Sequence, residues 1–284
     1  MSKEFNVEGL CLPEQHYMVS IGKQLEEIKA LVDKGKYFTI NRARQYGKTT
    51  TLHALKHKLD REYYVFSISF EGIEEEVFAN ADSFCIRLFG LLYDTIAFDE
   101  VTGVPAEIKE KLHELSLGNS SKSDFRTMTL MISYMCKKMN KPLALIIDEI
   151  DQASNYRVFD TFLGCLRDMY LKRGKRPTFQ SVILAGVYDI NNLKAKIRSD
   201  KEHTTNSPWN IAADFTVDMS LSEDGIRGML REYEEDYLTG MDIPYMASLI
   251  FEYTSGYPYL VSKICKLLDE RVTGSEGYPN KAAA

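Results

Sequence analysis

The chain has 284 residues, of which 44% are hydrophobic and 27% are charged. This is enough apolar material for a sizeable core and favours a globular protein of two domains. The formal net charge is −6, with 41 acidic and 35 basic residues, so there is no global electrostatic argument for nucleic acid as a partner.

The sequence pattern predicts neither a signal peptide nor a membrane span. The N-terminus lacks a basic stretch followed by an apolar one, and no apolar run reaches about 18 residues. The cysteines are scattered without metal-ligand spacing, which predicts reduced, mostly buried thiols and a cytoplasmic protein. They are Cys11, Cys85, Cys136, Cys165 and Cys265.

The first predicted elements are a helix and a short strand. Apolar residues recur at helical spacing over residues 20–34, and Gly35 is a stop signal. An apolar strand then begins at Tyr37, and after a turn Gly47-Lys48-Thr49 opens a second helix. This order of strand, turn and helix is the context required of a phosphate-binding P-loop.

The predicted loop has the back half of the P-loop pattern, whereas Arg42 stands where the pattern has its first glycine. Gly47 would let backbone amides approach a phosphate, and Lys48 would place its charge on the β- and γ-phosphates. The hydroxyl of Thr49 would bind Mg²⁺. The residues predicted to contact nucleotide here are Arg42, Arg44, Gln45, Tyr46, Gly47, Lys48, Thr49 and Thr50.

A strand and mainly helical segments follow the loop. Residues 62–70 are rich in aromatic and β-branched residues and predict a strand, and residues 84–94 predict a helix. Asp124 can cap a helix that carries a methionine stripe, which we interpret as core packing. Residues from about 74 to about 140 are therefore expected to form a helical insertion.

A buried strand over residues 142–147 ends in Asp148-Glu149 and is interpreted as a Walker B element. Asp148 would hold Mg²⁺, and Glu149 would be the catalytic carboxylate that polarises the attacking water. Lys48 is the second residue predicted to be catalytic. After a helix marked by apolar residues between 158 and 169, residues 180–187 predict another buried strand.

The alternation predicts an α/β fold: a three-layer P-loop NTPase sandwich with a mainly parallel, five-stranded sheet. The strand over 180–187 would lie between the two Walker strands, and its end would direct Tyr188 or Asp189 toward the γ-phosphate. Residues 214–219 would supply the fifth strand. This core is expected to span residues 1–219.

The remaining residues, 220–284, predict a small helical lid domain. Ser222 can cap one helix, and residues 246–251 indicate a second. Gly256 breaks that helix, and Pro258 can occupy the first turn of the next.

These motifs together resemble the bacterial AAA-ATPase-like proteins. The resemblance rests on the arginine-rich, glycine-poor loop, the strand that ends in Asp148-Glu149, the sequence Ile-Leu-Ala-Gly-Val at 183–187 and Ser-Pro-Trp-Asn-Ile at 207–211. The Gly256-Tyr257-Pro258 turn is similar to the adenine-side turn of STAND-type ATPases, which implies nucleotide contacts for Gly256 and Pro258. The likeness covers roughly residues 15–270 and implies ATP with Mg²⁺ as cofactors. Relatives often carry a nuclease-like domain, so the resemblance implies control of a protein partner or fused domain, with a homo-oligomer also open.

Three functions remain open at this point. The first is a Mg²⁺-dependent ATPase whose hydrolysis moves the lid or a partner. The second is a nucleotide-loaded switch or scaffold that hydrolyses little, which the missing glycine at position 42 suggests. The third is a small-molecule kinase, which is disfavoured because Asp148-Glu149 suits water activation better than hydroxyl phosphorylation.

Several residues allow more than one interpretation. Arg42 and Arg44 could contact phosphates or a neighbouring subunit, or pair with acids such as Asp148. The basic residues at 167–176 could be a solvated loop, an arginine finger or a DNA contact. Trp209 is expected to be a packing anchor rather than a base-stacking residue. His53 and His57 have metal-ligand spacing but no third ligand nearby in sequence.

Overall fold

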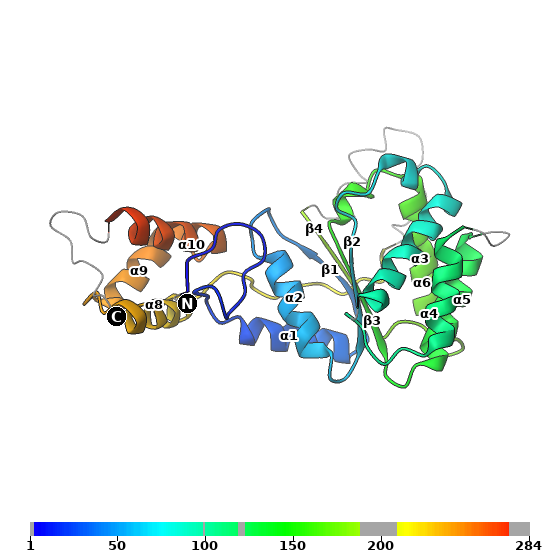
Figure 1. Cartoon of the computed structure of the whole chain (residues 1–284), viewed down its shortest axis with the longest axis horizontal. Coiled ribbons are helices and arrows are strands. Elements are labelled where there is room, and N and C mark those ends of the chain that lie inside the picture. Colours follow the sequence, from blue (N-terminus) through cyan, green and yellow to red (C-terminus); the bar gives the residue numbers. More distant parts are fainter. Residues whose placement is uncertain (1–2, 99, 119–122, 188–208, 273–284) are drawn as a thin grey trace. The chain divides into compact units, whose positions relative to one another are not determined.

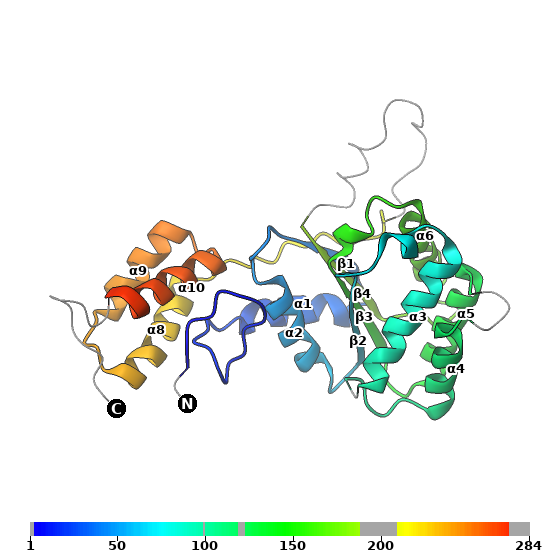
Figure 2. The same cartoon turned by 45° about the horizontal axis from the view of Figure 1, so that its top comes forward.

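A computed structural model describes the chain except residues 1–2, 99, 119–122, 188–208 and 273–284 (Figures 1 and 2). The chain divides into two compact units. We call residues 29–42 and 55–216 the sheet unit, and residues 1–28, 43–54 and 217–284 the bundle unit. The division of the chain after residue 219 stays a prediction; the chain enters the bundle unit for the last time at Val217, and residues 1–28 and 43–54 also belong to that unit.

The sheet unit contains a four-stranded, fully parallel sheet in the order β1-β4-β3-β2. β4 therefore lies between the strands of the two predicted motifs, as expected. The strands are β1 (Tyr37–Asn41), β2 (Tyr64–Ser69), β3 (Leu143–Asp148) and β4 (Ser181–Gly186). Every residue of β3 and β4 is buried, which explains their continuous apolar sequences.

The expected fifth strand over 214–219 is wrong: the sheet has four strands among the described residues. Ala213 makes an isolated parallel bridge with Phe38, and its N–H donates to the carbonyl of Tyr37 at 2.8 Å. Beyond that bridge, Phe215 stacks on Phe38 with ring centroids 5.8 Å apart. A side-chain contact thus replaces the ladder, and at Val217 the chain already belongs to the other unit.

Helices cover both faces of the sheet and give the predicted three layers (Figure 1). On one face lie α3 (Ala81–Ala97), α5 (Phe125–Lys138) and α6 (Arg157–Leu171), with α4 (Ala106–Ser116) packed on α3. The parts of α1 (Gly22–Asp33) and α2 (Lys48–Leu59) that belong to this unit lie on the other face.

Local signals set the helix boundaries. Asp124 accepts a hydrogen bond from the N–H of Thr127 at 2.9 Å and caps α5 as predicted. Gly35 has φ +64 after α1, the left-handed conformation expected of a stop signal. The helical insertion expected over about 74–140 contains α4, which was not singled out as a separate helix because its amphipathic stripe is short and lies in a polar stretch.

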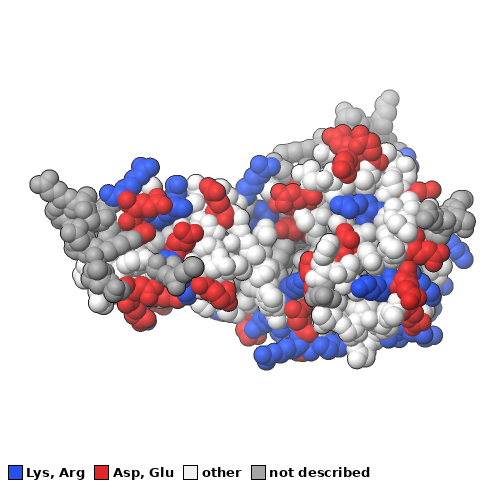
Figure 3. Space-filling view, viewed as in Figure 1, with Lys and Arg blue, Asp and Glu red and all other residues white. Residues whose placement is uncertain are grey.

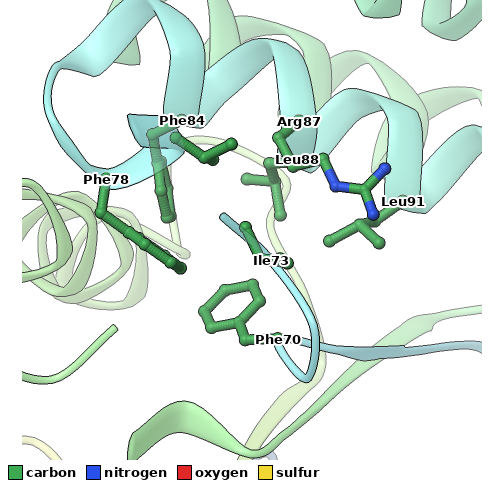
Figure 4. Close-up of a pocket in the computed structure, with 8 residues that line it drawn as sticks. Phe70, Ile73, Phe78, Phe84, Arg87, Leu88 and Leu91 are labelled. Atoms are coloured by element: carbon green, nitrogen blue, oxygen red, sulfur yellow. The ribbon is translucent and has the colours of Figure 1, made fainter. Parts of the chain in front are cut away.

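An aromatic cluster fills the space between the end of β2 and α3 (Figure 4). Phe70 follows β2, and its ring lies 6.0 Å from that of Phe78 and 6.1 Å from that of Phe84. This hollow leaves no room for a water-sized molecule. It is therefore packing that supports the strand ends and offers no space to a ligand.

The bundle unit is built around α8 (Glu223–Tyr237), α9 (Ile243–Thr254) and α10 (Pro258–Leu267), followed by a π-helical turn, Leu268–Val272. The cap at Ser222 is confirmed, since its hydroxyl accepts from Gly225 N–H at 3.1 Å, and Pro258 opens α10 as predicted. The N-terminal segment packs on these helices: Phe5 and Tyr17 meet Tyr233 with ring centroids 5.1 and 5.3 Å away.

No helix in the described part of the chain is both long and apolar enough to cross a membrane.

Candidate nucleotide site

The two predicted motifs start from the same edge of the sheet. Because β1, β4 and β3 are parallel and paired in register, Asn41, Gly186 and Asp148 stand at their carboxyl ends together. The P-loop follows β1 directly, beginning at Arg42. Strand ends and loop therefore arise where open α/β sheets bind ligands.

The bend of the P-loop is made at Gln45 and Gly47. These residues have φ of +60 and +74, whereas Arg42 is outside the left-handed region. A glycine is therefore not required at position 42 for the backbone to turn. The first residue of this loop with a left-handed backbone is Gln45, three positions after Arg42.

Arg42 lies against β1 and the segment after Ala213. Its Nη1 donates to the carbonyl of Asn41 at 2.9 Å, and its Cζ lies 5.4 Å from the ring centroid of Phe215. The latter is a cation–π arrangement. These contacts anchor Arg42 to the sheet unit, and its contact with phosphate stays a prediction.

Lys48 is the first residue of α2 and is only 6% exposed. Its ammonium donates to the carbonyl of Ala43 at 3.3 Å, so the side chain folds back over the loop. The N–H of Thr51 donates to the carbonyl of Gly47 at 2.9 Å and starts the helical ladder. The loop thus presents a buried cation together with the positive end of a helix, as phosphate binding requires.

Within the bundle unit, the P-loop contacts the predicted Gly256-Tyr257-Pro258 turn. The hydroxyl of Tyr257 donates to the carbonyl of Arg44, and the Tyr46 and Tyr257 rings meet edge-on with centroids 5.0 Å apart. The hydroxyls of Tyr46 and Ser220 are 2.8 Å apart. A Cβ added to Gly47 would lie 4.0 Å from Pro258. The structure therefore brings the two segments together, although the sequence placed them in different domains.

The backbone packing of the turn explains why residue 256 is a glycine. Its φ is +72, and a Cβ there would lie 2.1 Å from the carbonyl oxygen of Leu221. The carbonyl of Gly256 in turn accepts from the N–H of Leu221 at 2.8 Å. Only glycine fits this close backbone approach. A nucleotide contact for Gly256 remains a prediction.

The two acids at the end of β3 have different environments. Asp148 is 9% exposed, and its Oδ1 accepts from the N–H of Glu149 at 2.9 Å. Glu149 is partly exposed and adopts the left-handed conformation, with φ 53 and ψ 42. A non-glycine residue in this region is strained by roughly 1 to 3 kcal/mol, and such strain clusters at functional sites.

Asp151 and Gly186 also lie at this edge of the sheet, and the sequence did not indicate either as a site residue. The carboxylate of Asp151 accepts from the N–H of Val187 at 2.6 Å, just beyond the end of β4. Gly186 lies against the same carboxylate. The only sequence signal was the acid two positions after Glu149, and its partner was visible only once β3 and β4 were paired.

The donor set suits a magnesium ion that arrives with phosphate. Among the described residues, no group of three or more His, Cys, Asp or Glu side chains could hold a metal ion by itself. Mg²⁺ usually takes one or two protein oxygens and completes its shell with phosphates and water. The carboxylate of Asp148 in the sheet unit and the hydroxyl of Thr49 in the bundle unit are each ligands of that kind, and their binding to one ion stays a prediction. The same finding leaves His53 and His57 without support as a metal site.

The basic run before β4 lies at the opposite, amino edge of the sheet. Arg173 donates to the carbonyl of Gly35 at 3.0 Å and stacks on Tyr170 with its Cζ 4.1 Å from the centroid. Arg167 donates to Asn210 at 2.7 Å, and Lys172 pairs with Asp168. A polar hollow of about 350 Å³ adjoins Arg173. These contacts favour a structural role over a phosphate contact within the same chain.

The face of the molecule shown in Figure 3 carries both signs of charge. On the face shown in Figure 3, acidic and basic residues are interspersed over the part of the chain that the structure describes.

Trp209 is 1% exposed, and its indole N–H donates to Thr39 at 2.9 Å, which confirms a packing anchor. The expected γ-phosphate contacts Tyr188 and Asp189 lie outside the described residues, as do Ser207 and Pro208.

The chain is similar to known proteins in its fold and in its sequence family. A search of curated proteins found no match. Among solved structures, the Walker-type ATPase PABY2304 of Pyrococcus abyssi is similar, with a TM-score of 0.61 and 13% identity over 94% of this chain and 72% of that one. A chain of the Drosophila ORC bound to DNA matches with a TM-score of 0.49 and 12% identity over 95% of this chain and 60% of that one.

The first likeness supports the fold, an α/β sheet of the P-loop ATPase kind. The family model of the AAA-like domain matches residues 12–276. That match includes the P-loop, the acids at the end of β3 and the helices of the bundle unit. The chain therefore belongs to the AAA-like domain family.

Proposed function

We propose that the chain binds ATP with Mg²⁺ at the carboxyl edge of its sheet, hydrolyses it, and couples the nucleotide state to a protein partner or domain. The observation that carries this proposal is the P-loop itself. It joins β1 to α2, presents the buried Lys48 at a helix N-terminus, and starts from the edge at which Asp148 ends β3.

Each residue has a distinct role in this proposal. Loop amides around Gly47 and the ammonium of Lys48 bind the phosphates. Thr49 and Asp148 hold Mg²⁺, which neutralises phosphate charge when bound. Glu149 orients the attacking water and accepts its proton. The left-handed backbone at Glu149 supports this assignment, because backbone strain of this kind clusters at functional sites.

Contacts of the P-loop inside the bundle unit support the regulatory part. Tyr46 and Tyr257 connect the loop to Ser220 and to the start of α10. A phosphate that reorders the loop would act on these contacts directly, as in STAND-like regulatory ATPases. Gly256 and Pro258 would then form part of the nucleotide pocket, and a protein partner or a further copy of the chain would read its state.

ATP turnover and MgATP affinity of the purified chain test the proposal. We expect Lys48→Ala to weaken MgATP binding by at least about tenfold, because it removes a charge-assisted contact with phosphate. We expect Glu149→Gln to bind normally and to lower kcat by about 10²- to 10⁴-fold, the usual contribution of a general base. Lys56→Ala is the control, because Lys56 lies on the same helix as Lys48 and the substitution removes only an ion pair to Glu100.

Three results would change this assignment. Unchanged affinity in Lys48→Ala would remove the P-loop as the binding site. A wild-type chain that binds MgATP but turns it over no faster than Glu149→Gln would be a nucleotide-loaded switch. Equal affinity for ATP and GTP in competition would show that the base is not read.

A further inference from the structure

Asp151 ties the turn after β3 to the end of β4. Its carboxylate accepts from the N–H of Val187 at 2.6 Å. Asp151 belongs to a short 3-10 turn, Ile150–Gln152, which begins directly after Glu149. The turn is closed by the N–H of Gln152, which donates to the carbonyl of Glu149 at 3.2 Å. The contact therefore acts on the turn that carries Glu149.

Gly186 makes room for this carboxylate. A Cβ at Gly186 would lie 3.0 and 3.1 Å from the two oxygens of Asp151 and 2.8 Å from Cγ1 of Ile150. Gly186 does not have a positive φ, so its backbone conformation does not require glycine. The absence of a side chain is explained by the approach of Asp151 and Ile150.

The same strand end also contacts the start of the P-loop. The carbonyl of Gly186 accepts from the N–H of Arg42 at 3.2 Å. The end of β4 is thus bound on one side by the turn after β3 and on the other by the first residue after β1. All of these residues belong to the sheet unit.

We propose that Asp151 is a positioning residue that holds Glu149 in its catalytic orientation by fixing the turn after β3 to the end of β4. This inference rests on the proposed function, since it assigns Glu149 to water activation. Glu149 is strained, so its conformation persists only while the surrounding contacts determine it. The side-chain bond of Asp151 across to β4 is such a contact.

Steady-state kinetics test the proposal. We expect Asp151→Ala to lower kcat for ATP by about 10- to 100-fold, since small displacements of a catalytic group have effects of that size. KM and MgATP affinity should stay unchanged, because phosphate binding belongs to the P-loop. Asp151→Asn keeps an oxygen that accepts from Val187 and should recover most of kcat. Asp168→Ala, which removes an exposed ion pair to Lys172, is the control.

A double variant separates positioning from a general loss of structure. If Asp151 acts through Glu149, then Asp151→Ala should have little further effect in a Glu149→Gln background in single-turnover assays. Gly186→Ala should reproduce the kcat loss, because its Cβ displaces the carboxylate. It is the second variant to use if Asp151→Ala does not fold.

The outcomes are distinguishable. A wild-type kcat in both Asp151→Ala and Gly186→Ala would overturn the inference and leave the proposed function intact. A full additional loss in the Glu149→Gln background would also overturn it, because Asp151 would then act independently of Glu149. Absence of turnover in the wild-type chain would refute the proposed function, and this inference with it, before any Asp151 variant is made.

Discussion

At the scale of single residues, the position of a left-handed turn decides where a phosphate loop needs glycine. Arg42 replaces the first glycine of the P-loop pattern, but its backbone is not left-handed. Gln45 adopts φ +60 instead, in an exposed position that tolerates its side chain. The arginine side chain then contributes a contact with Phe215 that a glycine would not make.

Substitutions at Gln45 should therefore depend on the shape of the new side chain. Gln45→Val should lower the free energy of unfolding by about 1 to 2 kcal/mol and weaken MgATP binding, because a β-branched residue is disfavoured at positive φ. Gln45→Gly should change stability by less than about 1 kcal/mol. Chemical denaturation and MgATP titration measure both effects. A Val variant as stable as wild type would contradict the described loop conformation.

The sequence could supply some residues of the candidate site but not others. Gly47, Lys48 and Thr49 are adjacent, and Asp148 and Glu149 directly follow an apolar run, so local pattern was enough to select them. The contact between Asp151 and Gly186 depends on which strands are neighbours. The contact between Tyr46 and Ser220 likewise could not be predicted, because it depends on the packing of two segments of the bundle unit that lie far apart in the sequence.

At the scale of elements, buried strands were the most predictable because their neighbours are apolar on both faces. Helices with a capping residue, such as α5 after Asp124, were also found. The expected strand over 214–219 failed because alternating apolar residues do not reveal whether a partner strand continues beside them. In the structure only Ala213 pairs with β1 before the chain leaves the sheet unit.

The turn between α9 and α10 should tolerate substitution of Gly256 poorly. Gly256→Ala should lower the free energy of unfolding by more than about 3 kcal/mol, because it combines positive φ with a backbone overlap. Gly228→Ala is the matched control in α8, where an added Cβ meets nothing within 4 Å. It should stabilise the chain by about 0.5 to 1 kcal/mol. Thermal unfolding of both variants is the measurement, and equal midpoints would contradict the described turn.

At the scale of the whole molecule, the cysteines are distributed over both compact units. Burial raises the pKa of Cys85, Cys136 and Cys265 to about 12. Cys85 and Cys136 belong to the sheet unit, and Cys265 belongs to the bundle unit. Since the thiolate is the reactive form, each thiol can report the opening of its own unit.

Alkylation should therefore be slow in the native chain. At about pH 8 an ordinary thiol is roughly one quarter thiolate, whereas a thiol with the raised pKa is almost entirely protonated. Iodoacetamide should label Cys85, Cys136 and Cys265 only as denaturant exposes them, with fully unfolded protein as the control. Mass spectrometry of the peptides gives the extent for each unit. Rapid labelling of Cys265 without denaturant would contradict the described packing of the bundle unit.

The order of the strands also determines when the chain can fold during synthesis. β1 ends at Asn41, but its neighbour β4 begins only at Ser181. The bundle unit is likewise assembled from the first residues, the P-loop and the last helices. Neither unit can be completed until its late segments have left the ribosome. The nascent chain therefore carries an unpaired β1 while residues 42–180 are synthesised, a state in which chaperone binding competes with aggregation.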